Sequence, residues 1–414
     1  RMADVAVAPA ATGRAAARAD AARRHLQAIG REPRPAGGDA EARARAYAAG
    51  VLSAAGYAVR EEAFSYSSAV GRYAAPAAGA ASLAALLGAT LAGVRDRPVV
   101  AGGVLLFALA GMAGLAGYAS DRGVRRGRWL RRDAVNLVAE PAGYAAASPD
   151  GRARPRVWLV AHLDSKSQPV PMAARAGGVA VLVGAWVAAL VLSALHGLGW
   201  LVGARAMPLW PFVGLAAVVG AVPVMLSLVG TRSAGALDNA SGAAAVLLAA
   251  EELARSGAVR DDGTAATRAP VGVLLTSAEE LGLAGARAWV HAWARDGRAP
   301  GVALNCDGVD DVGDVYLWPA GHPPPELMRE ARRAAEGARV RSAPPGVLTD
   351  ANAFGAAEWA AFTVSRGTWA SLGRVHTPRD TLARLRGDGV PVAADVLARL
   401  ARLAAALTAA READ

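Results

Sequence analysis

The apolar positions of this chain are concentrated in four long stretches without any Asp, Glu, Lys or Arg, at residues 73–94, 98–120, 176–204 and 206–231. Each stretch is long enough for a helix that crosses a bilayer, which needs about 20 residues. Short connections join them in pairs. The pattern therefore predicts two transmembrane helical hairpins, at residues 73–120 and 173–231.

The rest of the chain alternates between strand-like and helix-like patterns. We expect helices at residues 14–30, 39–55, 240–254, 283–294, 326–337 and 390–410, and strands at 57–66, 135–139, 157–161, 271–276, 301–305 and 315–318. Residues 257–270 read as an exposed loop. Alternating strands and helices favour an α/β fold with a mostly parallel sheet and helices on both faces. This domain would consist of residues 1–72, 121–172 and 232–414, interrupted by the two hairpins.

Composition supports a membrane protein with a folded domain. Hydrophobic residues make up 54% of the 414 positions, and 47 more are Gly, which excludes a disordered chain. The net charge of +10 is carried by arginine, since Lys166 is the only lysine. We find no basic helix with interleaved aromatic residues, so we expect no nucleic-acid partner.

We expect neither a signal peptide in the first 30 residues nor an intrachain disulfide. Residues 1–30 contain several arginines and no continuous apolar core, so we expect no signal peptide there. Cys306 is the only cysteine, so no intrachain disulfide is possible.

Five short segments place acidic and histidine side chains at the ends of predicted strands or the starts of loops. They are VWLVAHLDS with His162 and Asp164, GALDNASG with Asp238, VLLTSAEELGLAG with Glu279 and Glu280, VALNCDGVD with Asp307, and GRVHTPRDTL with His376 and Asp380. Taken singly, Asp238 could cap a helix and Asp307 could end a strand at a turn. Taken together, two histidines and several carboxylates at the carboxyl ends of strands can hold two divalent metal ions.

The same motifs resemble those of the M28 family of zinc aminopeptidases, over residues 130–412 and more loosely over 14–66. The resemblance implies two divalent metal ions, with Zn²⁺ as the family's usual metal. It further implies His162, Asp238 and Asp307 as ligands of one ion, and Asp238, Glu280 and His376 as ligands of the other. Glu279 matches the general base, Asp164 the carboxylate that orients His162, and Asp350, in GVLTDANAF, resembles a residue near the substrate pocket.

The sequence also departs from the family. Asp164 and Asp238 are 74 positions apart, and the second hairpin lies between them, where soluble members have a short connection. We therefore expect a membrane-anchored exopeptidase that removes the N-terminal residue of peptides, with the lipid bilayer as its other partner. The alternatives are a carboxypeptidase-like or glutaminyl-cyclase-like enzyme of the same fold, or a non-catalytic membrane receptor or scaffold.

The distribution of arginine predicts the orientation of the hairpins. Six arginines lie between Arg122 and Arg132, whereas the opposite loops contain only Arg95, Arg97 and Arg205. Loops rich in Lys and Arg remain in the cytoplasm. We therefore expect the catalytic domain to face the cytoplasm. His196, near the far end of the third stretch, is expected to be an interfacial histidine.

Overall fold

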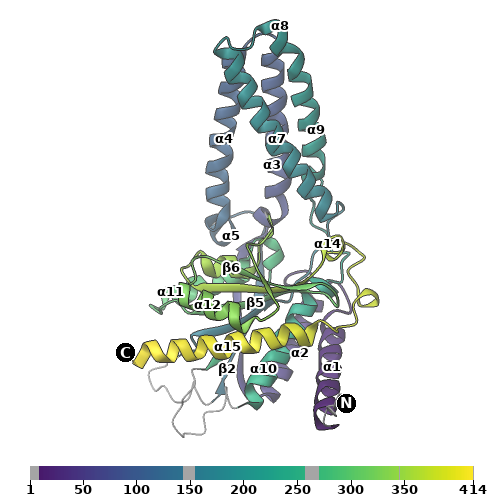
Figure 1. Ribbon diagram of the computed structural model, residues 1–414, viewed down its shortest axis with the longest axis vertical. Helices are drawn as coiled ribbons and strands as arrows, with labels where there is room; N and C mark the ends of the chain where they lie inside the picture. Colours follow the sequence, from purple (N-terminus) through teal and green to yellow (C-terminus); the bar gives the residue numbers. More distant parts are fainter. Residues whose placement is uncertain (1–8, 143–153, 257–269, 345, 414) are drawn as a thin grey trace, which may run out of the picture. The chain divides into compact units, whose positions relative to one another are not determined.

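The computed structural model describes residues 9–142, 154–256, 270–344 and 346–413. The chain divides into two compact units (Figure 1). Unit 1 consists of residues 1–65, 133–166 and 231–414, and unit 2 of residues 66–132 and 167–230. The loop expected at 257–270 lies almost wholly outside the described residues.

Unit 1 is built on a mixed sheet of eight strands, in the order β1-β2-β4-β3-β5-β8-β6-β7. Its strands are β1 (Tyr57–Ser67), β2 (Arg131–Pro141), β3 (Val157–His162), β4 (Val271–Thr276), β5 (Val302–Val309), β6 (Asp314–Ala320), β7 (Arg339–Val340) and β8 (Ala360–Gly367). The central strands β4, β3, β5 and β8 are parallel, while β2 and β6 pair antiparallel with β4 and β8. The four central carboxyl ends therefore meet at one edge of the sheet.

Helices cover both faces of this sheet, as the alternating pattern predicted. They are α1 (Pro9–Ile29), α2 (Asp39–Ala54), α10 (Ser241–Arg255), α11 (Ala284–Arg295), α12 (Pro325–Ala334), α13 (Asp350–Gly355), α14 (Trp369–Leu372) and α15 (Val390–Ala413). Helices α10 and α15 pack on β3 and β5 and on each other (Figure 1). On the other face, α11 and α13 enclose a core in which Trp158 of β3 meets Trp289 edge to face at 4.8 Å.

The observed strands differ from the expected ones at three places. The two-residue strand β7 and strand β8, the neighbour of β5, are absent from the expected set, and the apolar core of β8 is short. Strand β5 does not end at Asp307 but continues to Val309, with a shift of register after Cys306. Gly308 has a positive φ of 69° there, a conformation that glycine adopts without steric cost.

Unit 2 is a bundle of four long helices, α3 (Ala69–Gly93), α4 (Pro98–Ser120), α7 (Met172–Gly197) and α9 (Trp210–Met225), with the short helices α5 (Arg122–Arg126) and α8 (Gly203–Ala206). Helices α3 and α7 each pack against both α4 and α9. Small residues allow this close approach: a Cβ on Gly93 would lie 2.1 Å from the Trp210 ring.

The bundle has an apolar exterior as well as an apolar interior. Phe107 is 84% exposed and Phe212 is 69% exposed. The described residues contain four helices long and apolar enough to cross a membrane, which is compatible with a membrane protein. Two of them end earlier than their apolar stretches do, since α7 stops at Gly197 and α9 at Met225. His196, in the last turn of α7, lies 2.7 Å from the carboxylate of Asp96.

Candidate metal centre

The side chains singled out in the sequence lie together at the carboxyl edge of the sheet of unit 1. His162 is the last residue of β3, Asp307 lies in the irregular part of β5, and Glu279 and Glu280 follow β4 in a turn of 3₁₀ helix, Glu279–Leu281. Parallel neighbouring strands bring these segments side by side, although more than a hundred residues separate His162 from Glu279 and Asp307 in sequence.

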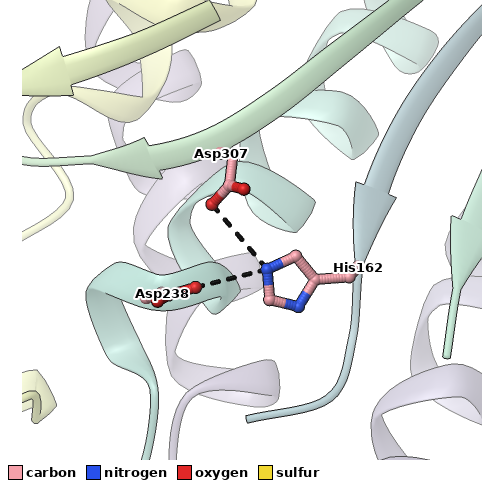
Figure 2. Close-up of side chains that lie close together, drawn as sticks. All are labelled: His162, Asp238 and Asp307. Atoms are coloured by element: carbon pink, nitrogen blue, oxygen red, sulfur yellow. Dashed lines mark ion pairs between the residues drawn. The ribbon is translucent and has the colours of Figure 1, made fainter. Parts of the chain in front are cut away.

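His162, Asp238 and Asp307 form the first group of possible metal ligands. The Nε2 atom of His162 is 3.2 Å from Oδ1 of Asp238 and 3.7 Å from Oδ1 of Asp307 (Figure 2). Both carboxylates point at the same ring nitrogen, from the loop before α10 and from β5 (Figure 2).

Asp238, Glu280 and His376 form the second group, so the Asp238 carboxylate is common to both. The Nε2 atom of His376 is 3.0 Å from Oδ2 of Asp238 and 3.1 Å from Oε1 of Glu280. His376 has a positive φ of 62°, which is uncommon for a residue with a side chain and is often found at functional sites. The two oxygens of Asp238 thus face one histidine each.

These two groups fit a pair of divalent cations. Among the described residues, the buried atoms Nε2 of His162 and Oε1 of Glu280 have no hydrogen-bond partner. Each of these two atoms nevertheless lies within 4.8 Å of the other imidazole and carboxylate atoms of its group. Side-chain atoms that bind one metal ion gather in this way. Imidazole and carboxylate suit Zn²⁺, and buried carboxylates need a compensating positive charge.

Glu279 lies beside these groups without belonging to either. Its Oε2 atom is 4.0 Å from Nε2 of His162, and the side chain is 6% exposed. Burial raises the pKa of Glu279 well above its usual value, and the negative charges of Glu280, Asp307 and Asp350 raise it further, against the opposing effect of His162. A carboxylate with a raised pKa is a stronger base than an ordinary carboxylate, which suits a group that accepts a proton.

Asp164 contacts the Glu279 segment as well as His162. Its two carboxylate oxygens accept the backbone N–H groups of Glu279, at 3.1 Å, and of Glu280, at 3.2 Å. Nδ1 of His162 lies 3.0 Å from the backbone carbonyl of Asp164 and 3.5 Å from its carboxylate. Asp164 therefore positions the two glutamates, while the nearest group to the histidine is its backbone oxygen.

The loop that carries Asp238 is fixed from two sides. Asp380 accepts the backbone N–H of Leu237 at 2.6 Å and that of Asp238 at 3.1 Å. The peptide bond between Asp238 and Asn239 is cis, and the Asn239 side chain donates to the carbonyl of Cys306 and accepts from Gly308. Asp380 thus supports Asp238, and Asn239 joins the Asp238 loop to the strand that carries Asp307.

Arg34, which the sequence did not indicate, is the centre of a further set of contacts. Its side chain is fully buried and donates to the carbonyls of Leu163 at 2.7 Å, Ala234 at 2.6 Å and Gly235 at 3.0 Å. Burial lowers its pKa to about 10, against the opposing charges of nearby carboxylates. One arginine therefore joins the segment after His162 to the segment before Asp238. A lone arginine in an arginine-rich region gives no signal of this role.

Lys166 and Asp350 make contacts that the sequence motifs do not predict. The Nζ atom of Lys166 is 2.7 Å from Oε2 of Glu280, so an ammonium group shares this carboxylate with His376. Asp350 is fully buried at the start of α13, and its carboxylate accepts the hydroxyl of Thr276. Asp350 has no exposed surface in this structure, so its place near a substrate pocket stays a prediction.

The gathered histidines and carboxylates lie at one edge of a mostly parallel sheet with helices on both faces, and their arrangement could hold divalent metal ions. Residues 219–401 match the model of peptidase family M28. This match is to the same peptidase family that the motifs resemble. The match contains Asp238, Glu279, Glu280, Asp307 and His376, and begins after His162.

Solved structures share the fold at low sequence identity. The aminopeptidase from Aneurinibacillus sp. strain AM-1 is 14% identical, with a TM-score of 0.51, over 94% of each chain. The zinc aminopeptidase BSAP from Bacillus subtilis is 13% identical, with a TM-score of 0.50, over 92% of this chain and 94% of the other. A Zn-dependent exopeptidase from Parabacteroides distasonis is 12% identical, with a TM-score of 0.50, over 93% and 97%. No curated protein matches the chain by sequence.

Proposed function

We propose that this protein is a membrane-anchored, zinc-dependent aminopeptidase that hydrolyses the N-terminal peptide bond of peptides. The observation that carries the proposal is the sharing of Asp238: its two carboxylate oxygens face His162 at 3.2 Å and His376 at 3.0 Å. A bridging carboxylate of this kind suits two cations. The zinc-dependent peptidases of the same fold support zinc as the metal.

Each residue of the site has its own role in the proposed reaction. Two divalent cations held by the two groups would polarise the scissile carbonyl and make a water molecule more acidic. Glu279, buried beside both groups, accepts a proton from the attacking water and delivers it to the departing amine. Asp164 holds Glu279 and Glu280 through their backbone N–H groups. Asp380 and Arg34 hold the flanking loops.

Metal analysis combined with an activity panel tests the proposal. Purified protein should contain close to two zinc ions per chain and should release 4-nitroaniline from aminoacyl anilides. A chelator should remove both properties, and added Zn²⁺ should restore them. One bound metal together with cyclisation of N-terminal glutamine would favour the glutaminyl-cyclase-like alternative. A metal-free, inactive protein would favour the receptor or scaffold.

We also propose that the catalytic domain faces the cytoplasm, on the basis of the arginines that follow the first hairpin. Labelling with a membrane-impermeant maleimide tests this orientation, because the only native cysteine, Cys306, is fully buried. In intact cells, a cysteine introduced at Trp200, in the loop after α7, should be labelled. A cysteine at Arg298, in unit 1, should be labelled only after lysis. The reverse pattern would overturn the orientation.

A further inference from the structure

A cavity of about 360 Å³ opens next to the candidate metal centre within unit 1. Leu237, Gly308 and Val375 line it, and each of these three is the sequence neighbour of a residue in the metal-ligand groups. The wall of the cavity therefore continues directly from the peptide segments that carry these groups. We refer to it as the side cavity. A molecule bound at the metal centre could therefore extend one of its groups into the side cavity.

Aromatic side chains form much of the side cavity. Tyr316 and Trp318 project from β6 with their rings stacked at a centroid distance of 6.4 Å. Trp369, at the start of α14, is 79% exposed, and Leu372 lies one turn further along the same helix. The flat walls favour an elongated side chain over a bulky branched one.

Three arginines and one aspartate also line the side cavity, and two of the arginines are engaged. Arg339 pairs with Asp314 at 2.8 Å. Arg366 donates to the backbone carbonyls of Asp310, Asp311 and Gly313. Arg341 is the third arginine, and it takes part in none of these contacts.

Arg341 is held by an aromatic ring rather than by an acid. Its guanidinium carbon lies 4.2 Å above the centroid of the Tyr316 ring. Among the described residues, no carboxylate lies within ion-pair distance of it, and the buried indole nitrogen of Trp318 also lacks an acceptor. Stacking fixes the guanidinium plane but leaves its N–H groups free to donate in that plane. The side cavity thus contains an oriented cation and an unused donor.

We propose that the side cavity binds a carboxylate of the substrate through Arg341, and that the protein therefore prefers peptides with an N-terminal glutamate or aspartate. This inference rests on the proposed aminopeptidase function. A carboxylate is the group that matches a planar guanidinium in two simultaneous hydrogen bonds. The aliphatic part of a glutamate side chain would lie along the aromatic wall.

Paired substrates of equal shape provide the test. For glutamyl and glutaminyl 4-nitroanilides, kcat/KM should be roughly 10- to 100-fold higher for the glutamyl compound, as expected for a hydrogen bond to a charged group. The Arg341→Met variant, which removes the guanidinium but keeps a long unbranched side chain, should bring this ratio close to one. Arg341→Lys should retain part of it. The control Arg333→Met removes the charge of an exposed arginine of α12 that does not line the cavity, and should leave the ratio unchanged.

Binding of the free amino acids gives a readout that is independent of turnover. L-glutamate should bind the zinc-loaded protein at least tenfold more tightly than L-glutamine in calorimetry, and Arg341→Met should abolish the difference. Equal binding of the two amino acids, or a difference that survives in Arg341→Met, would overturn the inference even if leucyl or alanyl anilides are hydrolysed.

Peptides with a free C-terminus distinguish two possible sources of the bound carboxylate, which are the side chain of the N-terminal residue and the C-terminus of the peptide. If no aminoacyl anilide is cleaved but N-blocked peptides with a free C-terminus are, and if this cleavage requires Arg341, the carboxylate is that of the C-terminus. The aminopeptidase proposal would then fail, while the carboxylate site at Arg341 would stand. Cleavage of those peptides without dependence on Arg341 would overturn both.

Discussion

The carboxylate of Asp164 accepts the backbone N–H of Glu279 at 3.1 Å, which connects the segment after β3 to the segment after β4. Its second oxygen accepts the N–H of Glu280 at 3.2 Å. The two glutamates belong to a short 3₁₀ turn that begins after Ala278, a residue with a positive φ of 57°. A single buried aspartate therefore sets the position of both the proposed base and a proposed metal ligand.

Replacing Asp164 by Asn should reduce activity without unfolding the protein. The Asn side chain keeps one acceptor oxygen but places an N–H₂ group opposite the second backbone N–H, so one of the two hydrogen bonds is lost. We expect kcat and zinc affinity to fall by roughly 10- to 100-fold, as is typical for groups that support metal ligands. Steady-state kinetics and zinc calorimetry would measure both. Asp296→Asn, an exposed substitution in unit 1, should change neither, and an unchanged kcat in Asp164→Asn would contradict the positioning role.

The neighbours Glu279 and Glu280 should respond differently to the same change. Glu279→Gln removes the proposed base but none of the metal-ligand groups, so kcat should fall by roughly 10²- to 10⁴-fold while zinc content stays the same. Glu280→Gln removes a ligand, so zinc content should fall as well. Metal analysis of the two variants beside their kinetics makes the comparison. If Glu279→Gln still turns over at the native rate, the base must be another residue.

Most of the metal-ligand groups could be predicted because the sequence marks strand ends clearly. His162 follows the apolar run of β3, and Glu279 follows that of β4. In a parallel sheet these ends share an edge, so proximity follows from topology alone. The resemblance to a known family then supplied a role for each residue.

The supporting contacts could not be predicted, because they depend on backbone geometry far away in the chain. Arg34 binds carbonyl groups about 130 and 200 positions further on, and no local pattern encodes such contacts. Strand β8 was missed because its sequence, AAFTVSRG, has a short apolar core and polar residues at its end. Asp380 belongs to the same short motif as His376, yet its carboxylate binds the backbone of Leu237 and Asp238.

The stability of unit 1 should decrease as the pH rises through the pKa of Glu41. Burial, and then the charge of Asp164, raise this pKa to about 8, against the opposing hydrogen bond from Gly37. The folded state then binds a proton that the unfolded state has already released, so stability is greatest below the unfolded pKa of 4.5 and falls as the pH rises to about 8. Glu41→Gln, which is always neutral, should flatten the dependence of the unfolding temperature between these limits. The exposed Glu32→Gln should retain the native slope, and an unaltered slope in Glu41→Gln would show that another group is responsible.

Lys166 should weaken metal binding at the group that contains Glu280. Its ammonium group lies 2.7 Å from Oε2 of Glu280, while Oε1 of the same carboxylate faces His376 at 3.1 Å. A cation bound there would share one carboxylate with the largely buried positive charge of Lys166, and the repulsion is strong where water is scarce. Lys166→Met keeps the length of the side chain and removes this charge. In zinc calorimetry of the metal-free proteins, we expect the weaker of the two binding steps to be about tenfold or more tighter in Lys166→Met than in the native protein. A factor of ten in affinity corresponds to about 1.4 kcal/mol, which is a modest share of the repulsion between two such charges. Lys166→Arg, which retains the charge, should leave that step weak. Weaker zinc binding in Lys166→Met would mean that the lysine holds Glu280 in its binding position instead of competing with the metal for it.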